Sequence, residues 1–224
     1  MNFVRVLFTL GCLTAPAGAC DLALLLAVDV SGSVSRDEYR IQSDGLAAAL
    51  RDGLVAEALI KARARVALVQ WSGTSRNEVT IPWMAIETYD DLDALAEKIE
   101  TDPRLWRDYS TAIGEALVIA EVQFADVPEC KRRVIDVSGD GSSNEGIEPL
   151  ERHPALRLAG ITVNALVIEG SEPDLDVYFW ENVITGEGAF MVTANGFDEY
   201  PAAIRRKLIR ETTKQLAWLK NVVR

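Results

Sequence analysis

Carboxylate and hydroxyl side chains gather in three short blocks of the sequence. Residues 29–33 read Asp-Val-Ser-Gly-Ser after a predicted strand, residues 110–111 are a Ser-Thr pair that opens a predicted helix, and residues 138–141 read Ser-Gly-Asp-Gly after another predicted strand. Because ligands of open parallel sheets bind at the carboxyl ends of the strands, we expect the blocks to meet at that edge. Oxygen ligands without imidazole or thiolate suit a hard cation, and so few charged ligands favour Mg²⁺ or Mn²⁺, which keep several waters.

The residues that we expect to hold the metal are Asp29, Ser31, Ser33, Thr111 and Asp140. Each block also has a purely structural interpretation. Asp29 and Ser33 could cap the helix after them, and Thr111 could cap a later helix. The Asp-Gly pair at 140–141 could form only a turn. Three blocks in one chain favour the metal site over three unrelated caps and turns.

Composition and missing motifs argue against several other functions. His153 is the single histidine, so a zinc site built on several imidazoles is excluded, and a histidine-based triad would depend on that residue. No phosphate-binding loop or dinucleotide fingerprint occurs, and Ser31 stands where a phosphatase with an aspartyl nucleophile would carry a second aspartate. The net charge of −11 repels nucleic-acid phosphates, so nucleic acid is not an expected partner. We therefore predict no enzyme, with hydrolysis by a metal-activated water as the alternative.

Alternating apolar and amphipathic segments predict an α/β fold with a doubly wound, mostly parallel central sheet, helices on both faces and one antiparallel edge strand. Residues 22–28 form a continuous apolar run, which is typical of a strand buried on both faces. Residues 66–71 and 77–83 predict a hairpin, whose second strand Pro82 places at the edge. Further strands are predicted at 133–138, 161–168 and 189–193, and helices at about 39–52, 91–100, 111–124, from 149, 174–184 and 198–220.

Asp136 stands out because it lies inside the otherwise apolar strand 133–138. We interpret it as a structural partner of a buried backbone or hydroxyl group and not as a metal ligand. The last predicted helix is strongly basic between residues 205 and 220, where Glu211 is the single acid beside six cations: Arg205, Arg206, Lys207, Arg210, Lys214 and Lys220. We interpret them as a solvated face, with a docking surface for an acidic partner or membrane phosphates as the alternative.

The first nineteen residues have the composition of a secretory signal. They carry one cation, Arg5, then an apolar run at 6–13, then small residues at 17 and 19. We predict cleavage before Cys20, export to the periplasm or the medium, and a single mature domain over residues 20–224 with a long C-terminal helix. The apolar run is too short to span a bilayer, so no transmembrane segment is expected. A lipid anchor on Cys20 is the alternative.

Two cysteines, Cys20 and Cys130, remain after the predicted cleavage. If the first and fourth strands are parallel neighbours, Asp29 and Asp140 mark the same level of the sheet. Cys20 lies nine residues before Asp29 and Cys130 lies ten before Asp140, so both thiols fall at the amino-terminal edge. Neighbouring strands are about 4.8 Å apart, which lies within the Cα separation of about 4.4 to 6.8 Å that a disulfide spans. We therefore predict a Cys20–Cys130 disulfide.

The three oxygen-rich blocks resemble those of a von Willebrand factor type A (vWA) domain with its metal-ion-dependent adhesion site (MIDAS). The Asp-x-Ser-x-Ser motif starts at Asp29, the threonine before Gly-x-Ala-Leu is Thr111, and the Asp-Gly pair after the fourth strand starts at Asp140. The resemblance covers roughly residues 21–214. A looser resemblance, to a secreted bacterial branch without an assigned function, depends on the leader, Cys20 and residues 136–141.

The vWA resemblance implies a role for each residue of the site. Ser31, Ser33 and Thr111 would bind Mg²⁺ or Mn²⁺ directly. Asp29 and Asp140 would bind it directly or through water. An Asp or Glu carboxylate of a partner protein would complete the shell, which makes the chain an exported, adhesion-type binding module.

The segment before Thr111 is a candidate rim of this site. Its residues combine aromatic and charged side chains, which are typical of interface anchors: Trp106, Arg107, Asp108 and Tyr109. A loop at 71–76 is expected at the same edge. A core tryptophan with a solvated arginine is the alternative interpretation.

Overall fold

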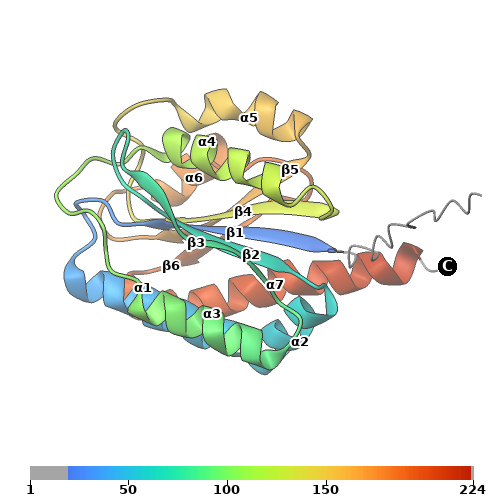
Figure 1. Cartoon of the computed structure of the whole chain (residues 1–224). Helices are drawn as coiled ribbons and strands as arrows, with labels where there is room; N and C mark the ends of the chain where they lie inside the picture. The colour runs from blue at the N-terminus through green and yellow to red at the C-terminus, as the bar shows by residue number, and fades with distance from the viewer. Residues whose placement is uncertain (1–19, 223–224) are drawn as a thin grey trace, which may run out of the picture.

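The computed structural model describes residues 20–222, and the predicted signal segment 1–19 lies outside them. Six strands form one sheet in the order β3-β2-β1-β4-β5-β6 (Figure 1). Every neighbouring pair is parallel except β2 and β3, which are antiparallel. This confirms the predicted fold class. The strands are β1 (Leu22–Asp29), β2 (Arg65–Trp71), β3 (Asn77–Ala85), β4 (Arg132–Gly139), β5 (Ile161–Ile168) and β6 (Met191–Ala194).

Helices cover both faces of the sheet (Figure 1). On one face lie α4 (Ile113–Gln123), α5 (Pro149–Leu158) and α6 (Leu175–Asn182). On the other lie α1 (Arg36–Leu50), α2 (Gly53–Lys61), α3 (Tyr89–Thr101) and the long α7 (Tyr200–Val222). Short 3₁₀ turns precede α7 at Phe197–Glu199 and follow α4 at Phe124–Asp126.

Strand β1 lies in the middle of the sheet and is buried along its whole length. Leu22, Leu24 and Leu26 belong to the apolar cluster under α1, α2, α3 and α7. Ala23, Leu25 and Ala27 belong to the cluster on the opposite face. The continuous apolar run therefore reflects burial on two faces, because successive side chains of a strand point to opposite sides.

Helix α2 was not expected, because Asp52-Gly53 is also a typical helix stop. Asp52 is instead the N-cap of α2, and its side chain accepts the backbone N–H groups of Leu54 and Val55. An aspartate can follow the end of one helix and can also accept the unpaired backbone N–H groups at the start of the next helix. The last strand also lies slightly later than expected, at Met191–Ala194.

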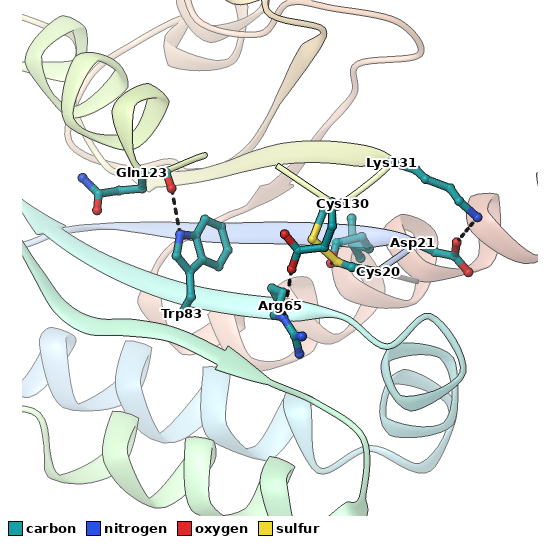
Figure 2. Close-up of a disulfide and its surroundings, with 9 residues drawn as sticks. Cys20, Asp21, Arg65, Trp83, Gln123, Cys130 and Lys131 are labelled. Atoms are coloured by element: carbon teal, nitrogen blue, oxygen red, sulfur yellow. Dashed lines mark hydrogen bonds and ion pairs between the residues drawn. A yellow bond between two sulfur atoms is a disulfide. The ribbon is translucent and has the colours of Figure 1, made fainter. Parts of the chain in front are cut away.

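The amino-terminal edge of β1 and β4 is closed by a disulfide between Cys20 and Cys130, whose Cα atoms are 4.5 Å apart (Figure 2). This confirms the pairing predicted from the register. Next to it, Lys131 Nζ lies 2.7 Å from Asp21 Oδ1. Because the Cys20 sulfur is bonded to Cys130, it is not available for a lipid thioether, and the lipid-anchor alternative is wrong for the disulfide-bonded chain.

The interpretation of α7 as a simple solvated basic face is wrong at Lys207. This side chain is fully buried, and its Nζ contacts Asp136 Oδ1 in the middle of β4. Asp136 is therefore the structural partner of a lysine on α7, and not of a backbone or hydroxyl group as expected. Burying one charge favours burying its counter-charge beside it, because an unpaired ion in the core is very costly. Among residues 20–222, no helix is long and apolar enough to cross a membrane.

Candidate metal centre

The loops that follow β1, β2 and β4 gather at the carboxyl-terminal edge of the sheet, with the segment before α4 (left side of Figure 1). β1 and β4 are hydrogen-bonded neighbours, with Val28 opposite Ser138. This register carries Asp29 and Asp140 to the same edge, as the sequence predicted. The topology therefore brings the first and third oxygen-rich blocks together.

Four of the five predicted residues are linked by hydrogen bonds. The Ser33 hydroxyl donates to Asp140 Oδ1 over 2.6 Å, and the Ser31 and Ser33 hydroxyl oxygens lie 3.1 Å apart. The Ser31 backbone N–H donates to Asp29 Oδ1 over 2.7 Å. Two carboxylates and two hydroxyls thus form one contiguous oxygen cluster.

The fifth residue, Thr111, is buried next to this cluster. Its backbone N–H donates to Asn144 Oδ1 over 3.0 Å, and its carbonyl accepts the Asn144 N–H over 2.9 Å. Its hydroxyl lies 3.8 Å from the position that a Cβ on Gly141 would occupy. The second block is thereby fixed against the loop that carries Asp140.

The capping interpretations of these residues are wrong. Helix α1 is capped by Ser35, whose side chain accepts the N–H of Glu38 while the Glu38 side chain accepts that of Ser35. Helix α4 begins after Ala112, without a side-chain cap. Since Ser35 and Ala112 occupy the N-cap positions of α1 and α4, the side chains of Asp29, Ser33 and Thr111 do not cap these helices.

The cluster is electrostatically suited to a cation. Asp29 is completely buried, and its Oδ2 has no hydrogen-bond partner among the described residues. Burial, and then the negative charge of Asp140, raise the pKa of Asp29 to about 7. Burial also raises the pKa of Asp140, against the hydrogen bond from Ser33. A positive charge beside these carboxyls would relieve both effects.

The backbone beside the unpaired oxygen is packed closely against it. A Cβ on Gly139 would lie 3.2 Å from Asp29 Oδ2, so any other residue would crowd this oxygen. Within residues 20–222, no group of three or more His, Cys, Asp or Glu side chains is arranged to hold a metal. A metal at this edge would therefore depend on the serine and threonine hydroxyls, which are hard oxygen ligands. The donor set fits a hard divalent cation.

A family model matches residues 19–216 of the chain. The chain belongs to this family, which is described as "Protein of unknown function (DUF1194)". No curated protein matches the DUF1194 chain in sequence.

Solved structures show that this DUF1194 chain has the vWA fold. Proximal thread matrix protein 1 from the mussel byssus, in a structure with a zinc-occupied MIDAS motif, has a TM-score of 0.65 and 16% identity over 87% of this chain and 46% of that chain. A von Willebrand factor type A structure from Catenulispora acidiphila has a TM-score of 0.62 and 17% identity over 88% and 43%. The pilus adhesin SpaC from Lactobacillus rhamnosus GG has a TM-score of 0.64 and 14% identity over 88% and 30%. The chain thus spans less than half the length of each.

The predicted rim lies at the same edge of the DUF1194 chain. The Tyr109 carbonyl accepts the N–H of Gly32 over 2.8 Å, which ties the segment to the loop after β1. The Tyr109 ring is partly exposed, and the Arg76 guanidinium carbon lies 3.9 Å from its centroid. Arg107 and Asp108 are exposed and Trp106 is half-buried. The loop at 71–76 therefore lies at the same edge, as expected, and its Arg76 packs on the rim.

Two residues at this edge were missed from the sequence. Arg104 Nη2 donates to the carbonyls of Val30 and Ser31 and so supports the first block. Glu172, in the loop after β5, accepts the Ser142 N–H with both carboxylate oxygens, each at 3.2 Å. Neither belongs to a motif, but Glu172 follows the strand next to β4, where the topology directs loops to the site.

Proposed function

We propose that this chain is an exported protein-binding module that captures a partner's Asp or Glu carboxylate through Mg²⁺ or Mn²⁺. The observation that carries the proposal is the buried Asp29, whose Oδ2 is unpaired while its neighbours are joined in one oxygen cluster. The residues that would hold the ion are Asp29, Ser31, Ser33, Thr111 and Asp140.

Each part of the chain has a distinct task in this proposal. When bound, a divalent ion supplies a positive charge and an open coordination position for a carboxylate oxygen. The serine and threonine hydroxyls contribute neutral ligands, and the two aspartates contribute the negative charge that holds the cation. The rim residues Trp106, Arg107 and Tyr109 would contact the partner around the carboxylate. Because the chain has a net charge of −11, its surface outside the site would repel an acidic partner, which would restrict binding to the site.

A binding role is favoured over catalysis by the state of Glu145, a spare carboxylate at the same edge of the sheet. Glu145 Oε2 accepts the Thr74 N–H over 3.1 Å. This hydrogen bond lowers the pKa of Glu145, so the carboxylate is a weak general base. We therefore propose that the site binds without turning over a substrate.

Export is supported by two observations. The Cys20–Cys130 disulfide requires an oxidising compartment to persist. Two proteins of the same fold are, by their titles, a byssus thread matrix protein and a pilus adhesin. We propose that residues 1–19 direct this chain to the periplasm or the medium and that residues 20–224 form the mature domain.

Calorimetric titration of Mg²⁺, Mn²⁺ and Ca²⁺ into the protein tests the metal site. We expect Mg²⁺ or Mn²⁺ to bind and to raise Tm, and Ca²⁺, which prefers more oxygens, to bind less well. Thr111→Ala and Asp140→Ala should lose binding but keep the fold. Glu145→Gln is the matched control at the same edge and should bind normally. No Mg²⁺ or Mn²⁺ binding to the folded protein would refute the proposal.

Capture from the parent cell envelope tests the partner. The wild-type protein should retain a partner in Mg²⁺ and release it in EDTA, and Asp29→Ala should retain none. If instead the metal-loaded protein hydrolyses an ester or a peptide and Glu145→Gln abolishes the hydrolysis, the site is a hydrolase.

A further inference from the structure

The edge of the sheet opposite the oxygen cluster carries a large basic groove. Its volume is about 680 Å³, and it crosses the amino-terminal ends of β4 and β5 between the end of α5 and the loop before β6. Four cations line it with one acid, Glu187: Lys131, Arg132, Arg133 and Arg157. Pockets for small molecules commonly enclose about 300 to 1,000 Å³. The groove therefore has the size of a ligand site in a chain whose net charge is −11.

Two of the four cations already have carboxylate partners. Lys131 Nζ lies 2.7 Å from Asp21, beside the disulfide (Figure 2). Arg132 Nη2 lies 3.0 Å from Glu211, which is fully buried. These pairs balance their own charges, so the net charge of the groove depends on the other two cations and on Glu187.

Arg133 and Arg157 are held by neutral oxygens instead. Arg133 Nη1 donates to the Ala159 carbonyl at 3.5 Å, and Arg157 Nε donates to the Thr185 hydroxyl at 2.7 Å. Neither arginine takes part in any salt bridge of the described residues. A guanidinium has five N–H donors, so most donors of each remain for a ligand. Two positioned arginines without a counter-ion favour an anion.

Three glycines form part of the wall beside these arginines. Gly160, Gly186 and Gly188 all line the groove and have positive φ angles of 67°, 96° and 64°. A Cβ on Gly186 would come within 2.8 Å of the Ile161 carbonyl oxygen, so only glycine fits there. Glycines let a ligand approach the main chain closely.

We propose that this groove binds an organic phosphate, with Arg133 and Arg157 binding the phosphate group and the glycine-lined space holding its organic part. A phosphate group offers several oxygens and more than one negative charge to two arginine forks, whereas a single carboxylate would leave donors unused. A long polyanion would also meet the acidic surface of the chain. A small ester is affected mainly by the groove, because salt screens charges beyond about 8 to 10 Å.

The proposed phosphate site is independent of the proposed metal centre. The eight residues of β4 separate them by roughly 25 Å at about 3.3 Å per residue. Asp140→Ala should therefore bind phosphate like the wild type. A failure of either proposal leaves the other standing.

Titration of glycerol 3-phosphate into ¹⁵N-labelled full-chain protein tests the site. We expect saturable shifts of the amide signals of Gly160, Gly186 and Gly188. Arg133→Gln and Arg157→Gln should each weaken binding about tenfold or more, because charge-assisted hydrogen bonds are strong. Arg206→Gln removes the same charge from an exposed position of α7 outside the groove and should change binding little. Using two arginine variants keeps the test valid if one fails to fold.

A second arm identifies the source of the phosphate. Vesicles of phosphatidylglycerol are compared with vesicles of phosphatidylcholine, using the wild type and Arg133→Gln. Solution binding of glycerol 3-phosphate supports a soluble ester, and binding only to phosphatidylglycerol vesicles, lost in Arg133→Gln, supports a lipid headgroup. Binding in neither arm overturns the proposal, as does equal weakening by Arg133→Gln and Arg206→Gln, which would show only general charge attraction.

Discussion

Replacing Lys207 by methionine should destabilise the fold by about 4 kcal/mol at pH 7 and by much less at pH 5. The Lys207 side chain is fully buried and contacts Asp136, which is 3% exposed. Glu211, one helical turn along α7, is also fully buried, receives the Asn164 amide N–H and pairs with Arg132. Methionine has a similar length but no charge, so the variant leaves one buried carboxylate in excess.

The magnitude follows from how the variant can neutralise that excess charge. It can bind a proton, and protonating a carboxyl with an ordinary pKa near 3.9 costs about 4 kcal/mol at pH 7 but only about 1.5 kcal/mol at pH 5. Burial already raises the pKa of Glu211 in the wild type, and the charge of Lys207 acts against this rise. A carboxyl whose pKa is raised on folding stabilises the folded state below its unfolded pKa, and this stabilisation is lost as pH rises through its folded pKa. The cost of Lys207→Met must therefore grow with pH.

Urea unfolding followed by circular dichroism at pH 5 and pH 7 measures this cost. Arg206→Met, at the exposed neighbouring position, controls for the change in net charge and in helix propensity. The double variant Lys207→Met with Asp136→Leu removes both charges and should recover much of the stability at pH 7. An equal loss at both pH values would show that packing, and not the abandoned charge, sets the cost.

Three further predictions concern other parts of the fold. Cys130→Ser should lower the free energy of unfolding in urea by up to about 4.7 kcal/mol, since the disulfide closes a loop with a sequence separation of 110; two titratable thiols in protein purified without reductant would contradict it. Gly114→Ala should lower Tm strongly, because its Cβ would overlap the Ile147 carbonyl oxygen, whereas Gly53→Ala, with open space around it, should not. Asp29→Asn should stabilise the EDTA-treated protein by at most about 4 kcal/mol at pH 8 and by less at pH 5. The pKa of this buried carboxyl is raised to about 7, so its ionisation destabilises the fold as pH rises. If urea unfolding shows no gain in stability at pH 8, Asp29 does not carry a buried charge.

The sequence was most informative where periodicity and register act together. The apolar run 22–28 predicted a strand buried on both faces, and that burial placed it at the centre of the sheet. Once β1 and β4 are parallel neighbours, counting residues is sufficient to place Cys20 beside Cys130 and Asp29 beside Asp140. Both pairs follow from the register of the two strands, which is fixed because a shift by one residue would turn the buried side chains to the opposite face of the sheet.

The sequence was least informative where one residue type can either end a helix or begin one, and where the role of a residue depends on a partner far away in the sequence. Asp52 both follows α1 and caps α2, and only the packing of α2 decides between the two. Lys207 lies in a basic segment that is typical of a solvated helix face. Its burial could not be predicted, because its partner Asp136 is far away in the sequence. Glu172 lies outside any motif and reaches the candidate site only through the order of the strands.

Strand β4 connects the two ends of the molecule, and its register determines whether the candidate metal centre exists. Cys130 precedes it, Asp136 lies at its middle and Asp140 follows it. A slip of one residue against β1 would turn Asp136 away from Lys207 and carry Asp140 away from the Ser33 hydroxyl. The disulfide and the buried ion pair each oppose such a slip, one at the amino-terminal edge and one in the core. Two constraints remote from the oxygen cluster thus hold its carboxylates in place, and such preorganisation would lower the cost of assembling the proposed metal site.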